Sequence, residues 1–236
     1  ASKALDSVVG ATSLPNAAEL TRRLMHYGQI LQSHALHFYH LASPDLLFGF
    51  GSDPLQRNVV GVIGKYPEIA KQGVLLRKYG QEVIRHTAGK RVHGTGSIPG
   101  GVNKRLTESE RQELLHPLPE ILTWSRNAVK LISDLHTQRR DVYDAFGTVR
   151  SSSMSLVARD GSLDLYDGVL RAKDADGNLI FDGVAASDYH TLLRENVRSW
   201  SYMKFPFIAS LGPDQGWYKV GPLARLQNCD RIPTPL

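Results

Sequence analysis

Apolar residues recur at three- and four-residue steps over the first half of the chain. The first run follows Pro15, and its positions are Leu20, Leu24, Tyr27, Leu31, His34, Phe38 and Leu41. Because residues at this spacing share one face of a helix, the run predicts a helix with Asn16 as its cap and Glu19 as the capping-box partner. A second set of residues recurs at the same three- and four-residue spacing: His26, Ile30, Ser33, His37 and His40. The helix is therefore predicted to be covered on two faces, as inside a large assembly.

Prolines and glycines divide the rest of this half. The string SPDLLFGFGSDP is predicted to break the first helix. A second helical region is predicted over residues 54–87, with a kink at Pro67. A third begins at the string TESE, where Thr107 and Glu110 have the spacing of a capping box, and Pro117 is predicted to interrupt it.

The pattern changes to alternation after Arg150. Residues 151–185 alternate between apolar and polar side chains, and Asp-Gly pairs divide them, so we predict short strands joined by hairpins. The string DADGN within this region has some likeness to a calcium loop. The bidentate acid that such a loop needs further along is missing, so we favour a plain turn.

The last part of the chain, residues 186–236, contains the string SDYHTLLRENVRSW from Ser187 onward. It predicts a short helix capped by Ser187, and the rest is rich in aromatic residues, Gly and Pro, which predicts irregular, extended structure. The fold class is therefore α+β and mainly α, with long packed helices and a small antiparallel β insertion in the second half. We expect a helical core over residues 1–150, a β-hairpin region over 151–185 and the tail over 186–236, all within one larger domain.

Composition narrows the class of protein. With 236 residues and 42% hydrophobic content the chain can bury a sizeable core. The net charge is +5, but Lys and Arg are scattered among the acids, so we expect no nucleic-acid partner. No apolar run is long enough for a membrane span, and the first residues lack the pattern of a signal peptide, which predicts a cytoplasmic protein. The single cysteine, Cys229, excludes an internal disulfide framework and a multi-cysteine metal site made by this chain alone.

The candidate chemistry is incomplete when the residues are considered alone. The loop KRVHGTGSIPGGVNK, residues 90–104, has neither the lysine of a P-loop nor the spacing of a dinucleotide fingerprint. Two of His34, His37 and His40 could share a helix face and bind a metal, but no acid or cysteine supports them, so we favour histidines hydrogen-bonded in a buried interface. No nucleophile motif surrounds Cys229. The residues thus predict a helical scaffold with a polar, tightly turned loop and no complete active site.

Three strings carry a resemblance to a known family. They are LTRRLMHYGQILQSHALHFYHLASPDLLFGF, GKRVHGTGSIPGGVNK and WSYMKFPFIASLGPDQGWYKVGPLARLQNCDRIPTPL. In this order they closely resemble the large, catalytic subunit of [NiFe] hydrogenases, in particular the soluble, bidirectional, NAD-reducing type. The likeness spans nearly the whole chain.

The resemblance implies a cofactor and partners. In this family four cysteines, from two Cys-x-x-Cys pairs, hold a NiFe(CN)2CO centre that splits H2 heterolytically, and thiolates suit such a soft, redox-active centre. Electrons then leave through iron-sulfur clusters in a small subunit to a flavin-containing module that reduces NAD. We therefore expect a cytoplasmic, heteromeric oxidoreductase whose substrates are H2 and protons.

None of the four cysteines occurs in this sequence, and Cys229 matches neither pair. We therefore expect an internal piece of a longer protein, inactive by itself, with no metal ligand or catalytic residue in residues 1–236 and the nickel-ligating cysteines outside them. The alternative is a metal-free structural relative, like the homologous quinone-site subunit of respiratory complex I.

The resemblance also implies positions near the cofactors. His93 matches a histidine that faces the proximal iron-sulfur cluster of the small subunit, and Gly100 and Gly101 would turn the chain beneath the metal site. Ser33 stands where many relatives carry an acid, which puts an acidic role there in doubt, although its hydroxyl could still hydrogen-bond. His37 would pack near the bimetallic centre.

Overall fold

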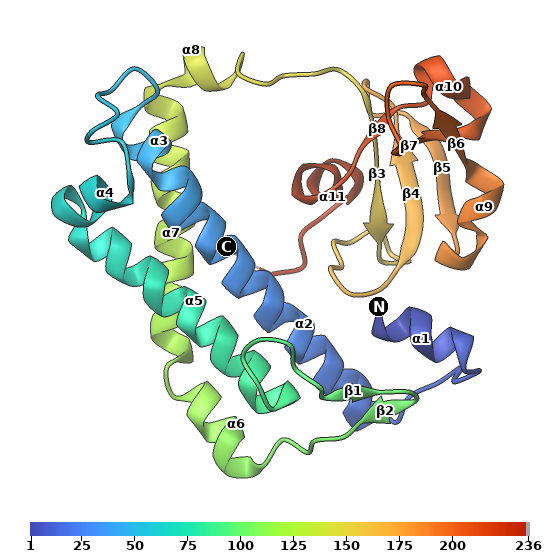
Figure 1. Cartoon of the computed structure of the whole chain (residues 1–236), viewed down its shortest axis with the longest axis horizontal. Helices are drawn as coiled ribbons and strands as arrows, with labels where there is room; N and C mark the ends of the chain where they lie inside the picture. The colour runs from blue at the N-terminus through green and yellow to red at the C-terminus, as the bar shows by residue number, and fades with distance from the viewer. Residues whose placement is uncertain (235–236) are drawn as a thin grey trace. The chain divides into compact units, whose positions relative to one another are not determined.

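A computed structural model describes residues 1–234 of the chain. The chain forms two compact units, Ala1–Tyr143 (unit 1) and Asp144–Leu236 (unit 2), and each is described by itself. Unit 1 is helical with one small hairpin, whereas unit 2 is built on strands (Figure 1).

The elements of unit 1 follow one another as a series of helices interrupted once. They are α1 (Ser2–Val8), α2 (Asn16–Leu36), the π-helical segment η1 (His37–Ala42), α3 (Ser43–Phe48), α4 (Val59–Lys65), α5 (Pro67–Ala88), β1 (Ser97–Ile98), β2 (Gly101–Val102), α6 (Glu108–Leu115), α7 (Leu118–Gln138) and α8 (Arg140–Tyr143). Two clusters form its core. They comprise Ala35, Tyr39, Leu76 and Ile121, and Leu47, Val62 and Leu135.

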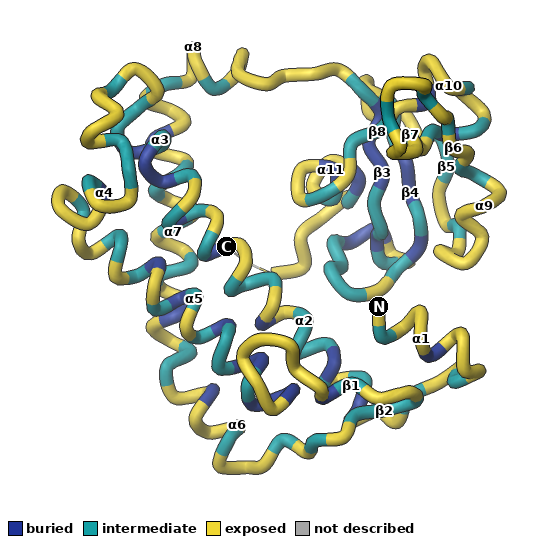
Figure 2. Tube along the Cα trace, viewed as in Figure 1, coloured by how far each residue is buried: buried dark blue, intermediate teal, exposed yellow. Residues whose placement is uncertain are grey.

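Glycines let the antiparallel helices α2 and α5 approach each other closely. A Cβ added at Gly80 would lie 2.7 Å from the backbone nitrogen of Gln32 and 2.7 Å from the carbonyl oxygen of Gly28. One added at Gly73 would lie 2.3 Å from the Cβ of Tyr39. The absence of side chains at these positions therefore sets how near the two helices lie, and buried residues follow both helices in Figure 2.

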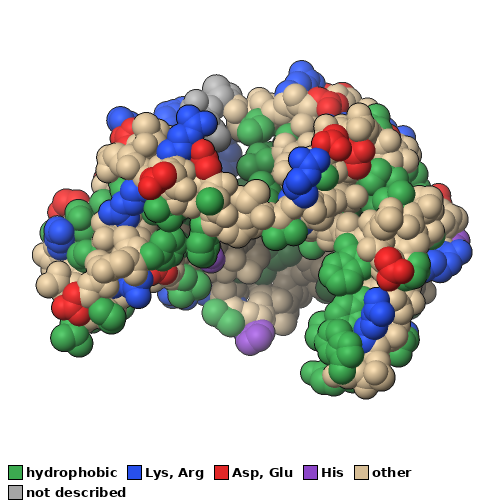
Figure 3. All heavy atoms as spheres, turned by 90° about the horizontal axis from the view of Figure 1, so that it is seen from above, with side chains coloured by type: hydrophobic (Ala, Val, Ile, Leu, Met, Phe, Trp, Pro, Cys, Tyr) green, Lys and Arg blue, Asp and Glu red, His purple; other side chains and the backbone are tan. Residues whose placement is uncertain are grey.

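The face of α2 that packs in unit 1 agrees with the predicted one only in part, since Leu31 and Phe38 pack against the core but other residues are the buried ones. Its buried residues are Ala18, Arg22, Gly28 and Ala35. By contrast, Leu20 and Leu41, which were expected on a covered face, are 57% and 63% exposed within this chain. Small residues form the contact because only they permit the close approach to α5, and the larger apolar residues flank it. Hydrophobic side chains accordingly lie among charged ones on the surface in Figure 3.

The predicted cap of this first helix was wrong, whereas its run does end within the predicted string SPDLLFGFGSDP. Pro15 is the N-cap and Asn16 the first helical residue, and no side chain caps the helix. Pro44 does not break it, because a proline in the first turn of α3 costs no intrahelical hydrogen bond. The helical run passes through η1 into α3 and ends at Gly49, whose φ is 88°.

The later helix boundaries of unit 1 confirm the prediction. Tyr66 separates α4 from α5, whose first residue is Pro67, and Pro117 lies between α6 and α7. The capping box forms as expected: Thr107 Oγ1 accepts from the amide of Glu110, and the Glu110 side chain accepts from the amide of Thr107.

Unit 2 contains a four-stranded and a two-stranded sheet. Its elements are β3 (Ser152–Val157), β4 (Val169–Lys173), β5 (Leu179–Val184), the 3-10 turn η2 (Ala186–Asp188), α9 (Tyr189–Leu192), β6 (Leu193–Val197), β7 (Lys204–Ile208), the 3-10 turn η3 (Ala209–Leu211), α10 (Gly212–Gln215), β8 (Tyr218–Lys219) and α11 (Pro222–Asn228). The larger sheet has the order β5-β4-β3-β8, with β8 parallel to β3, and β6 pairs with β7 antiparallel.

The predicted hairpins of unit 2 are confirmed, and the predicted tail is not. Asp174 accepts hydrogen bonds from the amides of Asp176 and Asn178, so the string DADGN forms the turn between β4 and β5. The helix over SDYHTLLRENVRSW ends early, since Leu193–Val197 is strand β6, and the N-cap of α9 is Asp188 rather than Ser187. The remainder is not irregular, because it holds β7, β8 and the helix α11 that packs on β3.

Among the described residues no helix has the length and apolar character needed to cross a membrane.

Candidate functional site

The polar loop of residues 90–104 follows α5 and folds back on its last turn. Gly89, with a φ of 82°, ends the helix in the left-handed conformation. The Thr95 amide donates to the carbonyl oxygen of Ala88 at 3.2 Å, and a Cβ at Gly96 would lie 2.7 Å from the carbonyl oxygen of Thr87. The loop therefore lies against the end of α5, and Gly96 is needed for that contact.

His93 occupies the most open part of this loop. Its φ is 52°, in the left-handed region that disfavours residues with a Cβ, and its side chain is exposed. Within the described chain its ring takes part in no hydrogen bond or ion pair. A strained backbone thus presents a free imidazole at the surface of unit 1.

The turn of the loop is the short hairpin β1–β2. Ile98 pairs with Gly101, so Pro99 and Gly100 are the two residues of the turn. Proline followed by a glycine with a φ of 73° has the residues and conformation of a type II turn. Gly100 therefore satisfies a real backbone requirement, as does the hydrogen bond that its amide donates to Asp6 Oδ1 at 2.9 Å.

A buried ion pair holds this turn. Arg22 Nη1 lies 2.5 Å from Asp6 Oδ2, and Arg22 and Asp6 are 3% and 5% exposed. The remaining donors of the guanidinium reach the hairpin backbone: Nη2 donates to the carbonyl oxygen of Ile98 at 2.6 Å and to that of Gly101 at 2.8 Å. Nε donates to the same Gly101 oxygen at 3.1 Å. Arg22 on α2 and Asp6 on α1 thus bind both ends of the turn.

The pKa of the Asp6 carboxyl is consistent with this buried ion pair. The hydrogen bond from Arg22, followed by the one from the Gly100 amide, lowers the pKa of the Asp6 carboxyl below its ordinary value. Asp6 is therefore a carboxylate at neutral pH, and the pair stays ionised. Sequence reasoning missed both residues; the available signal was an arginine on the small-residue face of α2.

A second polar network connects the loop to α6. Lys104 Nζ donates to Glu110 Oε1 at 2.7 Å and to the carbonyl oxygen of His86 at 2.7 Å. The hydrogen bonds from Lys104 and from the Thr107 amide lower the pKa of Glu110 to about 2. The buried His86 ring lies between two acids, with Nε2 3.2 Å from Glu113 Oε2. This network fixes the second end of the loop.

The structure gathers only some of the predicted site residues. His93, Gly100 and Gly101 lie in one loop, but Ser33 and His37 are exposed on the helical run of α2 and η1. Ser33 follows Arg22 by eleven positions, which is about 16 Å along a helix axis. The helix residues and the loop therefore do not form one site within the described chain.

The described residues do not fit a nickel centre. No three or more His, Cys, Asp or Glu side chains come together over residues 1–234 in a way that could hold a metal ion. Cys229 is half-buried, and its thiol donates to the carbonyl oxygen of Leu226 at 3.6 Å. The histidines are not an internal buried cluster either, since His34 is exposed and its Nδ1 lies 2.9 Å from the carbonyl oxygen of Ile30.

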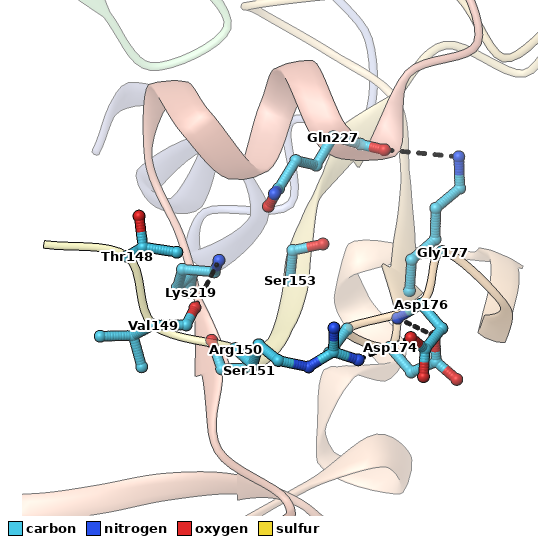
Figure 4. A pocket seen from close by; sticks show the side chains of 12 residues that line it. Thr148, Val149, Arg150, Ser151, Ser153, Asp174, Asp176, Gly177, Lys219 and Gln227 are labelled. Atoms are coloured by element: carbon cyan, nitrogen blue, oxygen red, sulfur yellow. Dashed lines mark hydrogen bonds and ion pairs between the residues drawn. The ribbon is translucent and has the colours of Figure 1, made fainter. Parts of the chain in front are cut away.

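Unit 2 has a polar pocket of its own, with a volume of about 400 Å³ (Figure 4). Its cationic side chains are already partnered: Arg150 pairs with Asp176 at 2.6 Å, and Lys219 donates to the carbonyl oxygen of Val149 at 3.2 Å. Lys173 donates to the carbonyl oxygen of Gln227 at 3.4 Å. Of the candidate sites weighed from the sequence only DADGN lines this pocket, and it forms the plain turn that was favoured there, so the candidate site remains the loop of unit 1.

Comparison with known proteins identifies the class. No protein-family model matches the chain. The chain is 40% identical to NAD-reducing hydrogenase HoxS subunit beta of Cupriavidus necator over 99% of its length and 50% of that subunit. It is 41% identical to one subunit of the vhu F420-non-reducing hydrogenase of Methanocaldococcus jannaschii, over 99% of its length and 55% of that subunit. The chain is therefore homologous to hydrogenase subunits, and it spans about half the length of these curated relatives.

Solved structures narrow the class further. A crystal structure of NAD+-reducing [NiFe]-hydrogenase in the H2-reduced state matches with a TM-score of 0.94 and 55% identity, over 99% of this chain and 52% of that one. The Ni-Fe-Se hydrogenase of D. vulgaris Hildenborough shares the fold, with a TM-score of 0.66 and 19% identity over 90% of this chain and 49% of that one. The chain has the [NiFe]-hydrogenase large-subunit-like fold and resembles the NAD-reducing type, which confirms the resemblance found in the sequence.

Proposed function

We propose that this chain contributes the central part of the catalytic subunit of a [NiFe] hydrogenase, which reversibly oxidises H2 and passes electrons through iron-sulfur clusters towards NAD. The observation that carries the proposal is the match over 99% of the chain, at 55% identity, to a structure described as an NAD+-reducing [NiFe]-hydrogenase. The relative from Cupriavidus necator, also named NAD-reducing, supports the same acceptor.

The role of these residues in that enzyme is to build the frame around the cofactors rather than to bind them. The described chain has no ligand set for nickel, so the cysteines that hold a NiFe(CN)2CO centre would lie outside residues 1–236. When bound, that centre would supply the splitting of H2. The residues here would position the loop of residues 90–104 and exclude water by packing helices beneath it.

Within this frame the loop would face a partner subunit that carries an iron-sulfur cluster. Three observations support that role for His93: an exposed ring, no polar partner within the described chain, and a backbone held at a φ of 52°. An imidazole N–H that donates to a cluster-ligating sulfur would tune the reduction potential of the cluster. Ser33 and His37, further along the α2–η1 run, would pack near the bimetallic centre.

The further partners follow from the same proposal. A flavin-containing module would receive the electrons and reduce NAD, and the complex would be cytoplasmic. Among the relatives, subunits named NAD-reducing and F420-non-reducing both match at about the same identity, 40% and 41%. The identity of the electron acceptor is therefore tested directly by measuring whether H2 reduces NAD.

The test is an assay of the complex purified with its natural partners. We expect nickel and iron in the preparation, H2-dependent reduction of NAD, and exchange of D2 with solvent protons. D2 exchange without reduction of NAD would support the proposed hydrogenase activity and overturn the proposal that NAD is the electron acceptor. Absence of both nickel and exchange would favour the metal-free alternative, which the hydrogenase names of the matching relatives do not support.

A further inference from the structure

The buried pair Asp6–Arg22 directs all of its polar contacts at one turn. Arg22 donates to Asp6, to the Ile98 carbonyl and to the Gly101 carbonyl, and Asp6 accepts from Arg22 and from the Gly100 amide. In the described chain no hydrogen bond of these two side chains ends elsewhere. A charged pair in the interior is costly unless its hydrogen-bonding capacity is used, and here the capacity is used on the hairpin backbone.

This turn needs support from outside the hairpin. A type II turn splays the strands that it joins, because its twist is opposite to that of the usual two-residue hairpin turns. Each strand has only two residues, Ser97–Ile98 and Gly101–Val102, and an isolated two-stranded hairpin is marginal in water. The carbonyl oxygens at both ends of the turn are the atoms that Arg22 binds.

The position of the turn is transmitted to the rest of the loop. The Asn103 amide donates to the carbonyl oxygen of Gly96 at 2.8 Å, and Asn103 Nδ2 donates to that of Thr95 at 2.7 Å. Thr95 in turn is bonded to Ala88 at the end of α5. His93 lies between these two fixed points, only two residues before Thr95, so the turn and the end of α5 together set the orientation of its backbone.

We propose that Asp6 and Arg22 are positioning residues that hold the turn of residues 98–101 against α1 and α2, and thereby fix where the loop presents His93. The hydrogen bonds of Asp6 and Arg22 to the turn support the first part of this proposal by themselves. The statement about His93 rests on the proposed function, because it assigns that residue a cofactor of a partner subunit.

Two substitutions separate positioning from charge balance. Asp6→Asn keeps the shape but removes the charge that Arg22 and the Gly100 amide bind. Arg22→Lys keeps the charge opposite Asp6, but a single ammonium cannot reproduce the planar fork that reaches Asp6, Ile98 and Gly101 together. If the pair only balanced charge, Arg22→Lys would behave like the native protein.

The first measurement is amide hydrogen exchange over residues 96–103 in the full-length, assembled protein. Loss of a hydrogen bond to a charged group predicts exchange at least about tenfold faster there in both variants, with α7 unchanged. Asp182→Asn is the matched control, since it removes a bidentate partner of the buried Arg171 in unit 2. The proposal would be overturned if amide exchange over residues 96–103 were unchanged in Arg22→Lys, or if the exchange rate rose equally throughout unit 1. If Asp6→Asn does not assemble, the result for Arg22→Lys decides.

The second measurement is the electron paramagnetic resonance spectrum of the reduced iron-sulfur clusters, together with the nickel content. We expect both variants to alter the spectrum of one cluster in the way that His93→Ala does, with nickel unchanged. Asp6→Asn and Arg22→Lys could show faster amide exchange while the spectrum stays unaltered in these two variants and in His93→Ala. That result would sustain the positioning of the turn and overturn the cluster-facing role of His93. The two proposals therefore fail separately.

Discussion

Arg22 in unit 1 and Arg171 in unit 2 are both buried, with 3% and 8% exposure, yet they support different kinds of structure. Arg171 lies on β4 and forms a bidentate pair with Asp182 on β5, at 2.9 and 2.7 Å, so it reinforces strands that are already paired. It also donates to the Asn228 carbonyl and to Asp230, which fastens the end of α11 to the sheet. Arg22 instead holds a turn that has almost no sheet of its own.

The packing around Arg22 is also tighter than the packing around Arg171. Arg22 lies on a helix whose neighbour is brought close by glycines, so little adjustment is available around it. Arg171 lies on the inner strand β4, but its carboxylate partners are 36% and 56% exposed. The comparison shows that the helix pair of unit 1 supports an irregular loop, whereas the arginine of unit 2 joins two strands that are already paired to the end of α11.

The largest effect should come from removing the close approach of α2 and α5. Gly80→Ala places a methyl group 2.7 Å from backbone atoms of Gln32 and Gly28, which cannot move aside as a flexible side chain could. We expect unit 1 to lose about 2 kcal/mol or more of unfolding free energy, despite the better helix propensity of alanine. Chemical denaturation of the full-length protein, followed by hydrogen exchange in each unit, measures this loss.

The control for this substitution has the opposite sign. Gly64, in α4, has open space around its Cβ position, so Gly64→Ala should stabilise unit 1 by about 0.5–1 kcal/mol through helix propensity. If both substitutions were neutral, the helix pair would be looser than the contacts indicate, and the contrast between the units would disappear.

The next effect should fall on unit 2. Arg171→Met removes the cation that Asp182 and Asp230 share and leaves Lys173, 3.5 Å from Asp230, as the remaining one. We expect a loss of about 2 kcal/mol, less than for fully buried pairs because both acids are partly exposed. Arg150→Met removes the exposed pair with Asp176 and should cost less than about 0.5 kcal/mol. Equal costs for the two variants would mean that the burial of Arg171 adds nothing.

A third test uses pH. The pKa of Glu110 is lowered from 4.5 to about 2 in the folded chain, so the stability that its ion pair with Lys104 contributes is fully present above about pH 4.5 and is lost as the pH falls through about 2. Glu110→Gln should therefore flatten the decline in the stability of unit 1 between pH 5 and pH 2. Denaturation midpoints at successive pH values report the slope.

Glu120→Gln serves as the reference for that slope. Glu120 is an exposed carboxylate in the first turn of α7 with no ion pair in the described part of the chain. We expect the decline with falling pH to persist in this variant. The interpretation of Glu110 would be contradicted if the two variants had the same profile.

The smallest effect on stability is expected at the proposed site itself. His93 is exposed and its ring has no polar partner in residues 1–234, so His93→Ala should change the unfolding free energy by less than about 0.5 kcal/mol. In the assembled enzyme the same change should slow electron transfer or shift a cluster potential while nickel content stays intact. Equal loss of nickel would point to a role in folding.

His93→Gly sharpens that test. Because glycine accepts a φ of 52° without strain, it should stabilise the loop by about 1 kcal/mol while it removes the imidazole. A variant that is more stable but impaired in electron transfer separates the chemistry of the ring from the conformation of the backbone.

The sequence predicted elements with local signals and missed those that depend on distant contacts. The capping box at Thr107, the break at Pro67 and the Asp-Gly turns are decided within a few residues, and all are present. The strand β6 was predicted as helix, because its pairing with β7 is a contact that helical propensity in LRENV does not reveal.

The candidate site was predictable as a loop but not as a supported structure. Glycines and a proline near His93 mark a turn in any sequence. The pairing of Asp6 with Arg22, and of both with a turn some eighty or ninety residues later, requires the folded chain. The buried face of α2 was missed for a related reason, since apolar periodicity identifies large residues and the contact is made by small ones.

The π-helical segment His37–Ala42 has a consequence for how this chain tolerates changes in length. Its i→i+5 bonding takes up one residue more than an α-helical turn, so the sequence phase slips between α2 and α3. Deleting one residue there would restore an unbroken α-helix with nearly the same rotation of α3, because the wider turn already holds the extra residue, so Leu47 would stay against Val62 and Leu135. A single deletion within this segment should therefore be tolerated better than one in the middle of α2, where it would rotate the rest of the helix by about 100°.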